Sequence, residues 1–207
     1  MIKALLLIFL PQPTWEHIAG VQRKAFVLFL TYLLPLLLIT TFAECYGLVH
    51  WGKPRGQVEH VTRFTVAQAT VFGVGRILSS IAIVLILAKL IKALGETFHG
   101  RHSIHQVFTL AAYSLSPLFV VRIFNMFPGV SPWLTWVIGL VLSLAVLYHG
   151  LPVIMKPDPP HAFGLYLMSS LMLTIVTGLI CFLTVWYLRG KFVKLDDAIS
   201  NLIKSAT

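Results

Sequence analysis

Long apolar runs separated by short polar segments dominate the hydropathy pattern of this chain. The cleanest run has nineteen uncharged residues, Ala25 to Ala43, between Lys24 and Glu44. At about 1.5 Å per residue, such a helix nearly matches a bilayer hydrocarbon core of about 30 Å. The run therefore predicts a first membrane-spanning helix that ends before Glu44. Pro35 is expected to kink it.

The second run is interrupted by two cations, Arg76 and Lys89, with only a dozen residues between them. That interval is too short to cross a bilayer alone. Along a helix, however, the two Cα atoms would lie about 20 Å apart, and long basic side chains can reach outward to the headgroups. We therefore predict a span over residues 71–94, with the two charges near opposite headgroup layers.

Three further runs complete a prediction of five spans. They cover approximately residues 106–127, 132–154 and 163–188. Tryptophan side chains near the ends of the last two are expected to anchor them in the interface; these are Trp133, Trp136 and Trp186. An odd number of spans places the two termini on opposite sides of the membrane.

The third run contains Pro117, which would cost a soluble helix about 3 kcal/mol. A membrane helix tolerates such a proline when a neighbouring hydroxyl or water satisfies the freed carbonyl, here that of Tyr113. We predict a kink at this point and a Tyr113 side chain that faces protein.

Both ends of the chain and the first loop are predicted to lie at the membrane surface. Met1–Gly20 has the charge and length of a signal peptide but no small-residue cleavage site, so it predicts a retained surface helix with Trp15 at the headgroups.

Residues 47–70 predict a loop with a short surface helix. Residues 191–206 predict an amphipathic helix, resting on the bilayer or docking a partner, because apolar residues recur every three or four positions: Phe192, Leu195, Ile199 and Leu202.

The composition agrees with a membrane protein. Of the 207 residues, 57% are hydrophobic and 11% are charged, against roughly 25% charged residues in soluble domains. We predict an all-α polytopic fold in which one membrane domain occupies residues 1–207.

The net charge of +9 does not indicate nucleic acid, because most Lys and Arg residues flank the apolar runs, where headgroup contacts are expected. These cations divide almost evenly between the two sides and so predict no orientation.

Three polar residues inside the predicted spans are candidates for a functional site: Arg76, Arg122 and Asn125. An alternative is that each arginine reaches an interface and that Asn125 caps a helix end. His99, His102 and His105 share a three-residue spacing that could form a metal-binding arc, but no further ligand completes a shell, and a solvated loop is favoured. We predict no metal and no other cofactor.

Catalytic patterns are missing from the sequence. None of its seven Asp and Glu residues is predicted to lie in the middle of the membrane, and no nucleotide-binding loop is present. We therefore predict that the protein is not an enzyme.

Several motifs occur in order along the chain. They are Leu10-Pro11-Gln12-Pro13-Thr14-Trp15 with Ile18-Ala19, Ala112-Tyr113-Ser114-Leu115-Ser116-Pro117, Ile123-Phe124-Asn125-Met126-Phe127-Pro128, and Tyr148-His149-Gly150-Leu151-Pro152 running on to Met155-Lys156. Together they resemble the Yip-type (YIP) family, the Ypt/Rab-interacting proteins of eukaryotic Golgi membranes and their bacterial relatives. The resemblance covers approximately residues 5–188 and marks Trp15, Tyr113, Pro117, Pro128, Tyr148, Gly150, Pro152 and Lys156 as family motif residues.

The resemblance implies five membrane helices with a cytosolic N-terminus, and for the bacterial branch a place in the inner (cytoplasmic) membrane. Eukaryotic members have a long cytosolic N-terminal region linked to small GTPases. Only about two dozen residues precede the first predicted span here, which argues against a small GTPase partner. The resemblance implies no catalytic residue.

Two classes of function remain open. The first is a non-catalytic scaffold or assembly subunit, with the bilayer, another membrane protein or a second copy of the chain as partner. The second is a small transporter or channel for an ion, lipid or apolar solute, which Pro35, Pro117 and the polar third span favour. Transporters of the common kinds are built from repeated halves. The chain shows no internal repeat, which favours the scaffold.

Overall fold

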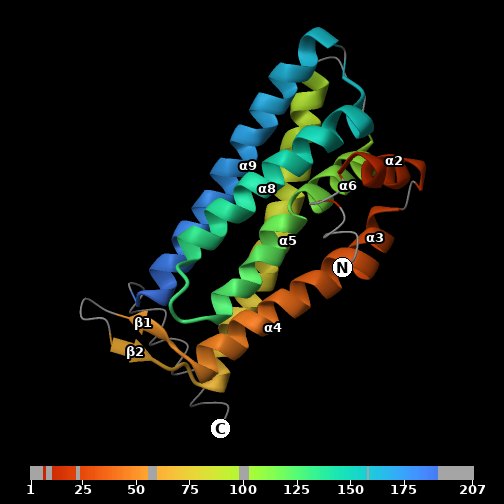
Figure 1. Cartoon of the computed structure of the whole chain (residues 1–207). Coiled ribbons are helices and arrows are strands. Elements are labelled where there is room, and N and C mark those ends of the chain that lie inside the picture. Colours follow the sequence, from red (N-terminus) through yellow and green to blue (C-terminus); the bar gives the residue numbers. More distant parts are fainter. Residues whose placement is uncertain are drawn as a thin grey trace.

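The fold is a bundle of long helices with a small hairpin at one end (Figure 1). It is given by a computed structural model that describes residues 7, 11–21, 24–55, 60–97, 103–157 and 159–190. The predicted amphipathic helix at residues 191–206 lies outside these described residues.

Five helical segments are long and apolar enough to cross a membrane, which confirms the predicted fold. The first comprises α3 (Ala25–Leu28), the π-helix η1 (Phe29–Leu33) and α4 (Leu34–His50), and the second is α5 (Val66–Thr97). The third comprises α6 (Ile104–Ser114), α7 (Ser116–Val121) and the 3-10 helix η2 (Arg122–Met126), the fourth is α8 (Pro132–Met155), and the fifth is α9 (Pro159–Leu188). Outside the spans lie α2 (Pro11–Gly20), β1 (Lys53–Arg55) and β2 (His60–Thr62).

The boundaries of the first two spans differ from the prediction. The first helix continues past Glu44 to His50, and the second begins at Val66. The prediction ended the first span at Glu44 because an unpaired carboxylate is costly in hydrocarbon. The helix continues because this carboxylate is paired inside the protein.

The first loop contains a hairpin. Strands β1 and β2 pair antiparallel, with Lys53 opposite Thr62. The short surface helix that we predicted in this segment is therefore wrong for its described residues, because α4 and α5 extend into both of its ends.

The third span is the centre of the bundle. In its most apolar stretch 78% of residues are buried within the protein, against 28–39% in the other four spans. It contacts α4, α5 and α8, while α9 packs against α5 and α8. A helix that is largely screened from lipid can carry polar side chains toward protein partners.

The predicted kink in the third span is confirmed. The α-helix breaks at Leu115, between α6 and α7, and Pro117 lies in the first turn of α7. The Ser116 hydroxyl donates a hydrogen bond to the carbonyl of Tyr113, the group that Pro117 leaves without its helical donor. The Tyr113 side chain is buried, as expected.

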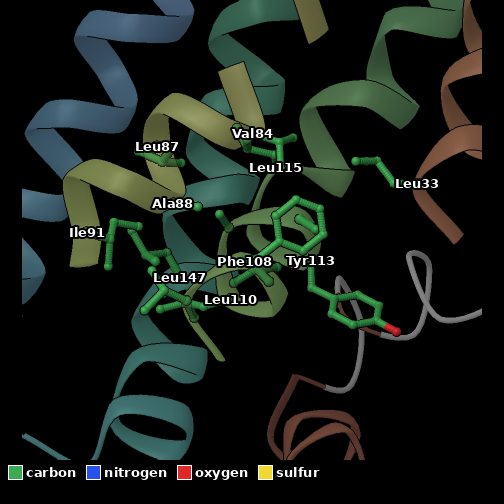
Figure 2. Packing of buried hydrophobic residues seen from close by; sticks show 14 of the residues in the cluster. Leu33, Val84, Leu87, Ala88, Ile91, Phe108, Leu110, Tyr113, Leu115 and Leu147 are labelled. Atoms are coloured by element: carbon green, nitrogen blue, oxygen red, sulfur yellow. The ribbon is translucent and has the colours of Figure 1, made fainter. Parts of the chain in front are cut away.

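Apolar side chains from α5, α6 and α8 meet around this break. Figure 2 shows Leu87 of α5, Phe108 of α6 and Leu147 of α8 among the side chains of one buried cluster, which also contains Tyr113 and Leu115. All five are buried. This packing holds the two halves of the third span in fixed positions against their neighbours.

A buried ionic cluster as candidate functional site

Glu44 is a buried carboxylate inside the first span. Only 4% of the residue is exposed. Its Oε2 accepts hydrogen bonds from Arg122 Nη2 at 2.7 Å and Arg76 Nε at 3.3 Å. Its Oε1 accepts one from Asn125 Nδ2 at 2.7 Å. Such charge-assisted bonds are about twice as strong as neutral ones, so they compensate much of the cost of removing the carboxylate from water.

The partners of Glu44 reach further into the bundle. Arg122 Nη1 donates to Ser80 Oγ at 2.8 Å, and Arg76 Nη1 donates to Thr184 Oγ1 at 2.9 Å. Asn125 Oδ1 accepts from Thr135 Oγ1 at 2.7 Å. We call this group the Glu44 cluster; its members are Glu44, Arg76, Ser80, Arg122, Asn125, Thr135 and Thr184.

The Glu44 cluster takes at least one side chain from each of the five spans. It lies toward the end of the bundle that carries the hairpin (Figure 1). Glu44 is six residues before the end of α4, which places its Cα about 9 Å along the helix from that end. The cluster is thus a polar connection among all spans, one to two turns inside the bundle.

The charges of the cluster do not balance. Two guanidinium groups, those of Arg76 and Arg122, face one carboxylate. Burying a charge costs several kcal/mol unless it is paired. Within the described spans, the cluster therefore retains one excess positive charge.

Lys53 closes the outer side of the cluster. Its Nζ donates to the carbonyl oxygens of Phe127 and Val130, each at 2.8 Å, and so ties β1 to the connection between η2 and α8. Burial lowers the pKa of Lys53, and the negative charge of Glu44 opposes that shift. A small cavity lined by Glu44 and Lys53 lies between them.

The sequence prediction for the polar residues is partly corrected. Arg76, Arg122 and Asn125 do lie inside the spans, but the alternative that they reach an interface or cap a helix is wrong, because their side chains bind Glu44. The same contact overturns the placement of Arg76 at a headgroup layer. Glu44 itself was missed. A signal for it was present in the sequence. Two arginines inside apolar runs need a carboxylate partner, and Glu44 directly follows the first apolar run.

Trp15 was also placed wrongly. Its side chain is fully buried rather than exposed to headgroups, and its Nε1 donates to the carbonyl of Val146 at 3.1 Å. The ring meets Tyr113 edge-on, with the centroids 6.0 Å apart. The Trp15 ring also lies against Gly150 of α8. Three family motif residues, distant in sequence, therefore share one packing centre.

The remaining family motif residues lie elsewhere. Tyr148 is exposed, and its ring packs edge-on against Tyr166 at 5.2 Å. Pro152 lies in the last turn of α8, and Lys156 caps that end of the helix: its N–H donates to the Pro152 carbonyl, and it adopts a left-handed conformation with a φ of 41°. Pro128 follows η2 near the Glu44 cluster. Their importance for function stays a prediction.

Of the three histidines of the candidate metal-binding arc, the structure describes one. His105 is exposed at the start of α6, while His99 and His102 lie outside the described residues. Within the described part of the chain, no group of three or more His, Cys, Asp and Glu side chains is arranged to hold a metal ion.

We expect Gly150→Ala to displace Trp15 from its site. A methyl group at position 150 would lie 2.4 Å from carbon atoms of the Trp15 ring, so the ring must move. Overpacking of this kind costs about 1–3 kcal/mol. Gly75→Ala in α5 is the control, because no atom lies within 4 Å of that position. Faster proteolysis before Ala25 in Gly150→Ala alone is expected; equal cleavage of both variants would contradict the packing.

The bundle and its buried cluster define an integral membrane protein with several spanning helices. Comparison with protein families gives a match to the Yip1 domain over residues 5–182. The chain therefore belongs to the Yip1 domain family, as its motifs indicated. Searches among curated proteins and solved structures returned no match.

Proposed function

We propose that this protein is a non-catalytic scaffold or assembly subunit, most simply of a bacterial inner membrane. The observation that carries this proposal is that the hydrogen bonds of the Glu44 cluster join all five spans. Buried polar networks make a core rigid and favour one arrangement of it to the extent that their members are hydrogen-bonded, and each member of the Glu44 cluster binds at least one other. A bundle fixed in this way presents a constant outer surface to a partner.

The acidic residues support a role without catalysis. A general base must be able to reach a substrate proton. Among the acids that the structure describes, Glu44 is occupied by three donors, while Glu16 and Glu96 are exposed on α2 and at the end of α5. Among the described residues, the cavity beside Glu44 is lined by no second acid and by no Ser, Cys or His side chain.

A specific observation favours transport of a small solute as the second candidate. A small cavity, with about 20 Å³ of water-accessible space, lies between α5, α7, η2, α8 and α9, and both arginines of the cluster line it. Polar cavities inside membrane proteins mark substrate or ion pathways. Here the kinked third span forms one wall.

The association state and the transport activity of the purified full-length chain distinguish the scaffold from the transporter. For the scaffold we expect a partner, either another membrane protein or a second copy, in a fixed molar ratio after extraction in mild detergent. Size-exclusion chromatography with light scattering and quantitative mass spectrometry measures that ratio. A chain that is always alone and that transports ions when reconstituted in liposomes would contradict the scaffold and support the transporter.

A further inference from the structure

The Arg122 guanidinium has one donor without a partner. Its Nη1 and Nη2 bind Ser80 and Glu44, but its Nε has no hydrogen-bond partner among the described residues, although only 4% of Arg122 is exposed. Leaving a buried charged donor unpaired is costly. An orphan of this kind in a native structure often marks the place of a water or an ion.

Arg122 lines the cavity between α5, α7, α8 and α9. Arg76 lines the same cavity, together with Thr135, Trp136 and Thr177. Among the residues that the structure describes, no acidic side chain lines it. The polar wall thus offers cationic and neutral donors, which is the chemistry that binds an anion rather than a metal ion.

The charge balance supports the same assignment. The Glu44 carboxylate can neutralise only one of the two guanidinium groups that contact it. Lys53, which lies beside Glu44, adds a further positive charge and is bound by two neutral carbonyl oxygens. In an interior of low dielectric constant, the remaining positive charge attracts an anion more strongly than it would in water.

We propose that this cavity binds one singly charged anionic group between Arg76 and Arg122. The group is either a small free anion or the phosphate of an anionic lipid, since both present the same charge to a guanidinium. The site is independent of the scaffold proposal, because a bound anion serves either as a structural ion or as a transported one.

Two substitutions alter the charge of the site in opposite directions. Arg76→Gln leaves the Glu44 and Arg122 charges balanced and should abolish anion binding. Glu44→Gln leaves two unopposed guanidinium groups and should strengthen it. Arg189→Gln is the matched control, because Arg189 is exposed in the turn after α9.

The experiment measures the thermal midpoint of the purified full chain as bromide replaces gluconate at constant ionic strength. Gluconate is too large for a cavity with about 20 Å³ of water-accessible space. In the parent and in Arg189→Gln, the midpoint should rise by about 3–6 °C when bromide reaches ten times its dissociation constant. The rise should be larger in Glu44→Gln and absent in Arg76→Gln.

Fluorescence gives a second readout that does not depend on the cluster variants. Trp136 lines the cavity, and its Nε1 donates to Thr177 Oγ1 at 3.2 Å. Bromide should quench a saturable part of the tryptophan emission, and Trp136→Phe should remove that part. Quenching that is linear in bromide and unchanged in Trp136→Phe would overturn a halide site in this cavity.

Vesicle composition distinguishes the two sources of the anion. A bromide response in pure phosphatidylcholine supports a free anion. A midpoint that is insensitive to bromide but rises with phosphatidylglycerol, and only while Arg76 is present, supports a lipid phosphate. The proposal is overturned if neither anion stabilises the parent, or if parent, Arg76→Gln and Glu44→Gln respond equally.

Discussion

Replacing Glu44 with alanine is expected to lower the free energy of unfolding by about 3–5 kcal/mol, the range found when one partner of a buried ion pair is removed. The substitution leaves the Arg76 and Arg122 guanidinium groups facing each other with no carboxylate between them. It also removes the acceptor of the Asn125 amide. The first span thereby loses its hydrogen bonds to the second and third spans, through which it is connected to Thr135 and Thr184 of the last two.

Glu96→Ala provides the matched control for this substitution. Glu96 pairs with Lys92 one turn earlier on α5 at 3.5 Å, but 59% of its side chain is exposed. An exposed pair of this kind contributes about 0.3–0.5 kcal/mol. Denaturant titration in detergent, followed by circular dichroism, measures both variants. Equal stability of Glu44→Ala and Glu96→Ala would show that the buried pair does not hold the bundle.

The part of the fold that the sequence predicts is the part that follows from short-range rules. Hydropathy identifies five spans because each must match the thickness of the hydrocarbon core. The break in the third span was predictable because Pro117 removes the donor to a carbonyl four residues earlier, that of Tyr113. The serine hydroxyl that compensates it is also local.

The candidate site depends on contacts that no short-range rule describes. Glu44 ends a span if its charge is unpaired and lies inside one if it is paired, and its partners Arg76 and Arg122 lie 32 and 78 residues further along the chain. Likewise, Trp15 is typical of an interface by residue type. It is buried because Val146, 131 residues away, accepts its N–H. Residue type gives the cost of burial, but the tertiary partner determines whether the residue is buried.

Gly47→Ala is expected to separate the first and third spans. A methyl group at position 47 would lie 2.3 Å from the carbonyl oxygen of Met126 and 2.6 Å from its Cα. These are backbone atoms, which cannot rotate away as a side chain does, so α4 and η2 must move apart. The cost should lie near the upper end of the range for overpacking, at about 3 kcal/mol.

The separation should also weaken the Glu44 cluster, because Asn125 precedes Met126 and its amide binds Glu44 at 2.7 Å. Gly75→Ala is the control: a methyl group there meets nothing within 4 Å, and alanine favours a helix over glycine by about 1 kcal/mol. Unfolding of Gly47→Ala, Glu44→Ala and the double variant then tests the coupling. Since both changes act on one contact, their destabilisations should not add. Full additivity, or a Gly47→Ala variant as stable as Gly75→Ala, would mean that the close approach of α4 and η2 does not hold the cluster together.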